Sequence, residues 1–381
     1  MIERYLKSRR KYFKYDVDED IVDLMPYFHE KNVEVIVVNS PSARNEIVRE
    51  KDGKWVVIWD TFYWKYFEQM VILLMSIYSD ENVKEDYELK LDYLEAVLYE
   101  FLSIKYKYNY PQISLCFAKQ GLSNKHKYLE IDYDRIKSVD AIIKMAKIDL
   151  LSHELGHIYI EKDKQLEDQV TNTVKEYLTY LNQIEGIYGE ISEDPEMRKV
   201  LNDVPDFIQG KNTNYLYELV DDAYSYVEGL DFVTNHLEFK EIAALYTQAA
   251  LLLRDYNRIV NSADGIVKTC LNYQNEDVDI DNPLIKATNY INFFRYTLYS
   301  PLILFFLTQL YKDYGISYEE FSEITNPIHE FQELYNRCIS PRVDNILRRE
   351  MPYLVQRVLE KKNLKKCDHI DEIVEFLFED I

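Results

Sequence analysis

The chain has 381 residues, of which 47% are hydrophobic, and its 67 acidic residues outnumber its 45 basic ones, giving a formal net charge of -22. This length and apolar content predict a folded protein with a sizeable core and exclude an intrinsically disordered chain. The negative charge would repel a phosphate backbone or an anionic lipid surface, so neither a nucleic acid nor a membrane is expected as a partner.

The cysteines and the hydropathy pattern indicate a protein of the cytoplasm. The four cysteines are far apart and form no CxxC pair, which is typical of reduced thiols rather than of disulfides. The first residues, MIERYLKSRRKYFKYD, carry charges where a signal peptide needs an apolar run. The longest apolar stretch, residues 298–310, is too short to cross a bilayer.

The first predicted strands lie near the N-terminus. Residues 32–39 (NVEVIVVN) are an apolar run of strand length. Residues 45–49 (NEIVR) and 54–60 (KWVVIWD) flank Asp52-Gly53, a dipeptide that favours a tight turn. These two segments are therefore expected to form an antiparallel hairpin.

Two helices are expected after this hairpin, at residues 62–79 and 85–106. They are followed by two segments in which apolar and polar side chains alternate, 112–118 (QISLCFA) and 127–134 (KYLEIDYD). Alternation with a period of two predicts half-buried strands. The N-terminal part is therefore expected to combine helices with a small mixed sheet.

From about residue 139 the pattern is almost entirely helical, because glycine and proline are scarce. Helices are expected at residues 139–161, 163–185, 195–204, 214–228 and 237–262, and through the C-terminal 100 residues. Breaks between helices are expected at Gly210, Gly229, Pro283 and Pro327. The sequence thus predicts an α+β fold that is mostly helical.

The helix expected at 139–161 carries the residues His153-Glu154-Leu155-Gly156-His157, which fit the pattern HExxH. Histidines four residues apart share one face of a helix, where both imidazoles can bind a single metal ion. Glu154 projects about 100° away, so it can reach an activated water without binding the ion. These residues predict a zinc site with Glu154 as general base. A pair of core or surface histidines is the alternative.

A third protein ligand is needed to complete such a zinc site. Asp163 stands where one class of HExxH enzymes has its third ligand, but Ile160 replaces the glycine that makes the required turn. Glu218 is the preferred candidate, because it lies along the apolar face of the helix expected at 214–228. That helix could pack beside the metal-binding helix with Glu218 directed at the ion.

Asp222 follows Glu218 by one helical turn and could hydrogen-bond the far nitrogen of a ligating histidine, which would fix its tautomer. Asp221 is expected to point further toward solvent, and Glu228 lies near the end of the helix, so both are weaker candidates. An ordinary acidic helix edge is the remaining alternative for this group of carboxylates.

With HExxH at His153–His157 and ExxxD at Glu218–Asp222, the chain resembles the gluzincins, zinc peptidases that combine these two motifs on two helices. It more faintly resembles the ImmA/IrrE group, whose second motif reads roughly ExxAxxFA. Tyr224 fits the aromatic position of that motif, whereas Asp221 and Ser225 stand where it has small residues. The connection between the two motifs is also longer than in that group.

The resemblance implies a zincin-like core, in which the small N-terminal sheet packs on the metal-binding helix. In that fold an edge strand pairs with extended substrate, and residues 127–134 are the candidate for it. The expected organisation is N-terminal helices and sheet at residues 1–135, the zinc-binding helical part of the catalytic domain at 136–236, and a helical C-terminal region of unknown role at 237–381.

The motif and the resemblance together predict a zinc-dependent endopeptidase with a protein or peptide substrate. Zn²⁺ is the expected cofactor, with His153, His157 and Glu218 as ligands and Glu154 as general base. Three residues are candidates for the donor that stabilises the oxyanion, namely Tyr224, Tyr226 and His236. The sequence does not choose among these three.

The ImmA/IrrE group cuts regulatory proteins, so by analogy the expected substrate is a regulatory or host protein in stress or defence. Hydrolysis of a smaller amide is a second option within the same chemistry. The alternative from a different class is a helical interaction protein that keeps a zincin core as a scaffold, with residues 237–381 as its working part. The sequence gives no indication of the oligomeric state.

Overall fold

The computed structural model describes residues 14–22, 24–41, 45–49, 53–79, 84–124, 131, 138–188, 213–234, 239–272, 299, 302–309, 312, 315 and 317–362. The chain forms two compact units, each assembled from segments that are far apart in the sequence. Unit 1 comprises Met1–Asp140, Ile259–Thr288 and Phe331–Ile381, and unit 2 comprises Ala141–Arg258 and Asn289–Glu330. The three-part organisation expected from the sequence stays a prediction.

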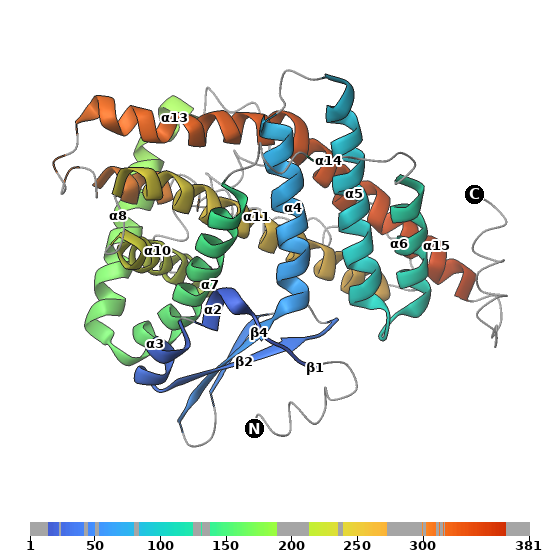
Figure 1. The fold of residues 1–381 in the computed structure, drawn as a ribbon, viewed down its shortest axis with the longest axis horizontal. Helices are drawn as coiled ribbons and strands as arrows, with labels where there is room; N and C mark the ends of the chain where they lie inside the picture. Colours follow the sequence, from blue (N-terminus) through green and yellow to red (C-terminus); the bar gives the residue numbers. More distant parts are fainter. Residues whose placement is uncertain are drawn as a thin grey trace. The chain divides into compact units, whose positions relative to one another are not determined.

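Within these residues the protein is mostly helical, with a small mixed sheet near the N-terminus (Figure 1). The mostly helical α+β class is therefore confirmed. The sheet belongs to unit 1 and the HExxH residues to unit 2, and a zincin-like packing of one on the other stays a prediction. None of the helices in the described part of the chain has the length and apolar character that a membrane crossing requires.

The sheet has the strand order β1-β2-β4-β3. β2 (Val33–Asn39) runs parallel to β4 (Trp55–Asp60), whereas β1 (Lys14–Tyr15) and β3 (Glu46–Arg49) pair antiparallel with β2 and β4, respectively. Every residue of β4 is buried, as expected for a central strand. In the turn between β3 and β4, Gly53 has a φ of 87°, which glycine adopts at little cost. The first predicted strand and the predicted hairpin are confirmed.

Unit 1 also contains two groups of helices. The N-terminal group is α2 (Glu19–Val22), α3 (Met25–Glu30), α4 (Thr61–Ser79), α5 (Lys84–Tyr106) and α6 (Pro111–Asn124). The C-terminal group is the π-helical turn η2 (Tyr335–Ile339), α14 (Ser340–Asn345), the π-helical turn η3 (Ile346–Glu350) and α15 (Met351–Lys362). α4, α5 and α6 lie side by side (Figure 1). α4 and α5 confirm the two helices expected after the hairpin.

α6 replaces the strand that was expected at residues 112–118, so that prediction is wrong. Ile113 and Phe117 are buried, whereas Leu115 between them is only half-buried. This spacing of four places Ile113 and Phe117 on one face of a helix. Gly121 extends the same face, because a Cβ there would lie 3.2 Å from the backbone oxygen of Ala96. The packing of α6 on α5 thus selects the helical period.

Unit 2 is built from long helices. These are α7 (Val139–Lys162), α8 (Lys164–Tyr188), α10 (Thr213–Thr234), and most of both α11 (Phe239–Asn272) and α13 (Tyr318–Leu334). The predicted helices at 139–161, 163–185, 214–228 and 237–262 are confirmed, and α10 and α11 extend beyond the predicted ends.

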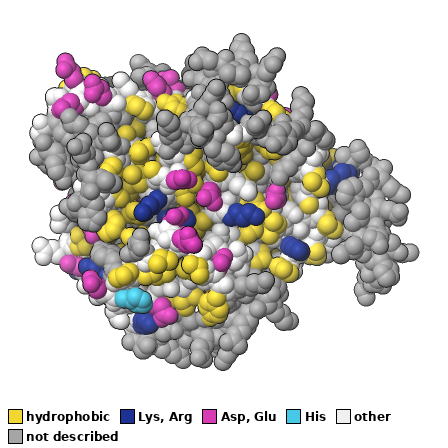
Figure 2. Space-filling view, in the orientation of Figure 1, with side chains coloured by type: hydrophobic (Ala, Val, Ile, Leu, Met, Phe, Trp, Pro, Cys, Tyr) yellow, Lys and Arg dark blue, Asp and Glu magenta, His cyan; other side chains and the backbone are white. Residues whose placement is uncertain are grey.

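On the face drawn in Figure 2, acidic and basic side chains lie next to one another among hydrophobic ones.

Two of the expected helix breaks are wrong, because Gly229 lies inside α10 and Pro327 inside α13. Gly229 makes room for another side chain, since a Cβ there would lie only 1.9 Å from the hydroxyl oxygen of Tyr246. A proline inside a helix removes one backbone hydrogen bond. Thr325 and Ile328 are buried on either side of Pro327, so packing accompanies the helix through the proline.

Several predictions fall outside the described residues. They are the strand at 127–134, of which only Ile131 is described, the helix at 195–204, the breaks at Gly210 and Pro283, and the oxyanion candidate His236.

Candidate metal centre

α7 carries the HExxH residues in the interior of unit 2. The apolar side chains at every fourth position before the motif are all buried, namely Ile142, Ala146 and Leu150. This spacing is that of a helix face packed against the core. It continues into the motif, where His153 is 6% exposed and Glu154 is 7% exposed. His153 and Glu154 are therefore shielded from solvent, whereas His157 is half-buried.

α10 approaches α7 closely at Gly156, between the two histidines. A Cβ at Gly156 would lie 3.1 Å from Cδ1 of Tyr224 and 3.6 Å from Oδ1 of Asp221. Glycine at this position thus permits a helix spacing that a larger residue would widen. The close approach brings the acidic turn of α10, Glu218 to Asp222, up to the two imidazoles.

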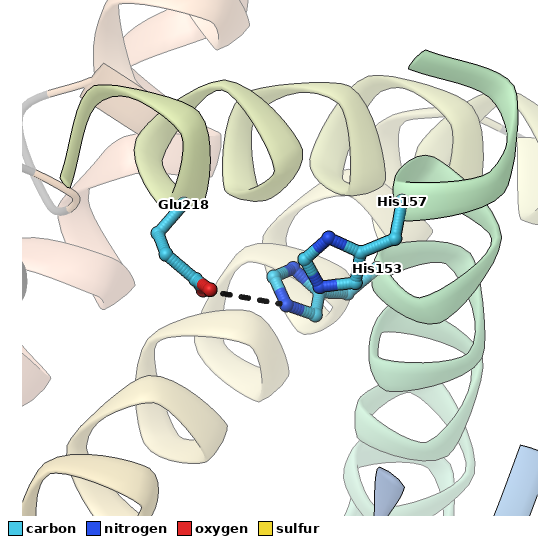
Figure 3. A group of neighbouring side chains, drawn as sticks. All are labelled: His153, His157 and Glu218. Atoms are coloured by element: carbon cyan, nitrogen blue, oxygen red, sulfur yellow. Dashed lines mark ion pairs between the residues drawn. The ribbon is translucent and has the colours of Figure 1, made fainter. Parts of the chain in front are cut away.

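His153, His157 and Glu218 form a group that could hold a metal ion. One ligand atom from each lies within 4.8 Å of the others, and Nε2 of His153 is 3.9 Å from Oε2 of Glu218. Figure 3 shows the Glu218 carboxylate directed from α10 toward the two imidazoles of α7. The imidazole centroids are 4.7 Å apart, with the ring planes at 79° to each other. The structure thus brings together the three residues that the sequence singled out as ligands.

Each histidine also has its own carboxylate partner on α10. Nδ1 of His153 lies 3.2 Å from Oδ1 of Asp222, and Nδ1 of His157 lies 2.6 Å from Oδ2 of Asp221. Both aspartates are buried, so the expectation that Asp221 points toward solvent is wrong. The cause is that residues 219–223 of α10 are all buried and this turn has no solvent face.

Glu154 is buried next to the group without being one of its three members. Burial raises the pKa of the Glu154 carboxyl above its ordinary value, because a buried site disfavours the charged form. His153 and His157 oppose this rise, and Glu218 adds to it. A carboxylate with a raised pKa is a better proton acceptor than an exposed one.

A buried polar network continues from Asp222 into α11. Nε of Arg254 lies 3.2 Å from Oδ1 of Asp222, and Nη2 of Arg254 donates a hydrogen bond of 3.1 Å to Oδ2 of Asp149. The hydroxyl of Tyr246 donates a hydrogen bond of 3.0 Å to Oδ1 of Asp149. Sequence reasoning missed this network. Its one signal was Asp149 four residues before His153, on a helix face that is otherwise apolar.

Among the other sequence candidates, Asp163 does not approach the histidines. It is exposed between α7 and α8, where its Oδ1 accepts hydrogen bonds from the backbone nitrogens of Gln165 and Leu166. It therefore caps the N-terminus of α8. Glu228 is half-buried and lies well inside α10, which continues to Thr234.

The two described oxyanion candidates differ in their surroundings. Tyr226 is fully buried, and its hydroxyl shares a hydrogen bond of 2.8 Å with Thr247. The structure therefore argues against Tyr226 as the oxyanion donor. Tyr224 is half-buried beside Gly156, where its ring packs against the hydrophobic core of unit 2. Its part in oxyanion stabilisation stays a prediction.

The charges around the group favour a bound cation. Among the described residues, its immediate surroundings hold one guanidinium, that of Arg254, and five carboxyl groups, those of Asp149, Glu154, Glu218, Asp221 and Asp222. Burial lowers the pKa of His157, but the negative charges of Asp221, Glu154 and Glu218 outweigh burial and raise it to about 9. The same potential that holds a proton on His157 would attract a metal ion, which must displace that proton.

No protein-family model matches the sequence, and no curated protein or solved structure matches it either.

Proposed function

We propose that the protein is a zinc-dependent metallopeptidase that cleaves peptide bonds within a protein or peptide substrate. The observation that carries this proposal is the His153, His157 and Glu218 group, with ligand atoms within 4.8 Å of one another. Glu154 lies buried beside this group. A structural metal site has no use for such a carboxylate, whereas hydrolysis needs a proton acceptor next to the metal.

The donor set fits zinc. Two imidazoles and one carboxylate are the ligands of many catalytic zinc sites, and bonds of about 2.0 to 2.2 Å place tetrahedral donors about 3.3 Å apart. The 3.9 Å between His153 and Glu218 is close to this separation. The other two carboxylates of the turn, Asp221 and Asp222, lie on the Nδ1 side of the rings, which leaves Nε2 for the ion.

The number of ligands favours catalysis over a structural role. Structural zinc sites are closed by four protein ligands, whereas catalytic sites use three and keep one position open. Within the described residues the group contains three possible ligands. A substrate carbonyl or a water can therefore take the fourth position.

Each residue then has a distinct part in hydrolysis. A zinc ion at this site would supply a Lewis acid that activates water near neutral pH and polarises the scissile carbonyl. Glu154 accepts the proton of the attacking water and delivers it to the leaving amine. Asp221 and Asp222 hold the two imidazoles in one orientation and one tautomer.

The substrate is proposed to be a regulatory or host protein, in keeping with the resemblance to the ImmA/IrrE group. The alternative is a helical interaction protein on a zincin core. Substitution of Glu154 distinguishes these two functions, because only the peptidase needs a proton acceptor. Glu154→Gln preserves side-chain size and removes the proton acceptor, so fold and zinc should survive while hydrolysis is lost.

The experiment adds zinc-loaded wild type or Glu154→Gln to a lysate of the source organism and identifies new protein termini by mass spectrometry. We expect cleavage products with the wild type, a fall of several orders of magnitude with Glu154→Gln, and the intact substrate retained by the variant. Absence of new termini with zinc-loaded wild type would exclude the peptidase and favour the interaction protein.

A further inference from the structure

Arg254 is a buried guanidinium that joins three polar groups of unit 2. Its side chain is 5% exposed. Nε lies 3.2 Å from Oδ1 of Asp222, and Nη2 donates to Oδ2 of Asp149 at 3.1 Å and to Oγ of Ser225 at 3.0 Å. The ring of Tyr299 covers the guanidinium, with its centroid 5.1 Å from Cζ. These contacts hold the guanidinium in place from several sides.

One oxygen of Asp222 connects Arg254 to the metal group. Oδ1 of Asp222 lies 3.2 Å from Nε of Arg254 and also 3.2 Å from Nδ1 of His153. Neither nitrogen has another hydrogen-bond acceptor within the described part of the chain. Because buried donors need an acceptor, both depend on the position of this one carboxylate. If Arg254 moved, the Asp222 carboxylate would move with it, and the orientation of the His153 ring would change.

Asp149 anchors Arg254 from the other side. Its Oδ2 accepts from Arg254, and its Oδ1 accepts from the hydroxyl of Tyr246 at 3.0 Å. Tyr246 reaches this position because Gly229 carries no side chain, since a Cβ there would lie 1.9 Å from the hydroxyl oxygen. Asp149 of α7 and Arg254 of α11 thus help to determine the position of Asp222 on α10.

Stability alone is a poor explanation for these buried charges. Taking a guanidinium and two carboxylates out of water is costly, and apolar packing of the same volume is often at least as stable. The network does provide a planar guanidinium that bonds in fixed directions. Such rigidity matters most where an imidazole ring must keep one orientation in order to bind a metal ion.

We propose that Arg254, anchored by Asp149, is a positioning residue that orients His153 for metal binding through Asp222. This inference rests on the proposed function, because it assumes that His153 is a metal ligand. Removing Arg254 takes away the contact between its Nε and Oδ1 of Asp222, which should let the carboxylate shift relative to Nδ1 of His153. Loss of a partner of this kind typically lowers metal affinity by about 10 to 100-fold.

The test measures Co²⁺ binding to the full chain, which reports ligand geometry through its visible absorption without any substrate. Arg254→Gln should weaken Co²⁺ binding by about 10 to 100-fold and shift the absorption at saturating Co²⁺. Arg254→Lys keeps the charge but cannot bond both aspartates in a fork, so it should restore part of the affinity. Asp149→Asn should reproduce a weaker form of the Arg254→Gln effect.

Arg258→Gln is the matched control. Arg258 is also buried on α11, one turn further along, and its Nε donates a hydrogen bond of 2.8 Å to Asp255 rather than to Asp222. Its replacement should lower the melting temperature of the metal-free protein and leave Co²⁺ affinity and absorption unchanged. If Arg254→Gln does not fold, Asp149→Asn and Arg254→Lys carry the same comparison with this control.

The outcomes separate this inference from the proposed function. Wild type that binds Co²⁺ while the Arg254 and Asp149 variants retain its affinity and absorption would overturn the positioning role alone. An equal loss in Arg254→Gln and Arg258→Gln would also overturn it, because both would then act only through the fold. Wild type that binds no Co²⁺ would overturn the metal site and this inference together.

Discussion

Nδ1 of His157 lies 2.6 Å from Oδ2 of Asp221, so the second histidine of the HExxH motif has a buried carboxylate partner of its own. Asp222 lies next to His153 in the same way, at 3.2 Å. One turn of α10 therefore carries a metal-ligand candidate, Glu218, and one carboxylate for each imidazole. This arrangement leads to separate expectations for each acidic residue of the turn.

Asp221→Ala should lower zinc affinity by about 10 to 100-fold, because His157 would lose the partner that fixes its tautomer. Competition with a chelator of known affinity measures the change. Asp231→Ala is the matched control, since Asp231 lies on the same helix and is exposed. Equal zinc affinity in wild type and Asp221→Ala would show that the contact with His157 has no bearing on metal binding.

Glu218→Ala should release zinc, because it removes one of three ligand candidates. Asp163→Ala should leave zinc bound and lower the free energy of unfolding by about 1 kcal/mol, because Asp163 caps α8. Zinc content and thermal unfolding of the metal-free proteins measure the two effects. The opposite pattern, with zinc lost from Asp163→Ala and retained by Glu218→Ala, would reverse the assignment of the third ligand.

Gly229→Ala should destabilise the protein by about 1 to 3 kcal/mol, the usual cost of an overpacked core. The new Cβ would lie 1.9 Å from the hydroxyl oxygen of Tyr246 and 2.8 Å from Cζ. Removing the hydroxyl as well, in Gly229→Ala with Tyr246→Phe, should relieve part of the clash. Denaturant unfolding of both single variants and the double variant tests this, and additive losses would contradict the contact.

The local pattern of the sequence was sufficient to find the motif and its partner helix. HExxH places two histidines about one helical turn apart. Glu218 and Asp222 stand on a second helix whose apolar face can be recognised in the sequence. The structure brings these four residues together. Asp221 was missed because the sequence argument assumed a solvent face, whereas residues 219–223 of α10 are all buried. Arg254 and Asp149 were missed because their pairing joins residues that lie more than a hundred positions apart.

The expected strand at 112–118 shows a different limit. Over seven residues the positions of Ile113, Leu115 and Phe117 fit a period of two, and only the packing of α6 on α5 selects the helix. The helix makes a testable distinction, because Phe117 is fully buried and Leu115 is not. Phe117→Ala should lower the free energy of unfolding by about 3 to 5 kcal/mol, and Leu115→Ala by less. Equal losses in denaturant unfolding would instead favour the strand.

The measurement that tests the central claim most directly is the zinc content of the purified chain after incubation with zinc and removal of the excess. Elemental analysis should find one zinc per chain in the wild type, because two imidazoles and Glu218 lie within reach of one ion. His157→Ala should hold little or none, because one of those imidazoles is gone. A folded wild type that retains no zinc under these conditions, or a His157→Ala variant that retains as much as the wild type, would contradict the metal centre described above.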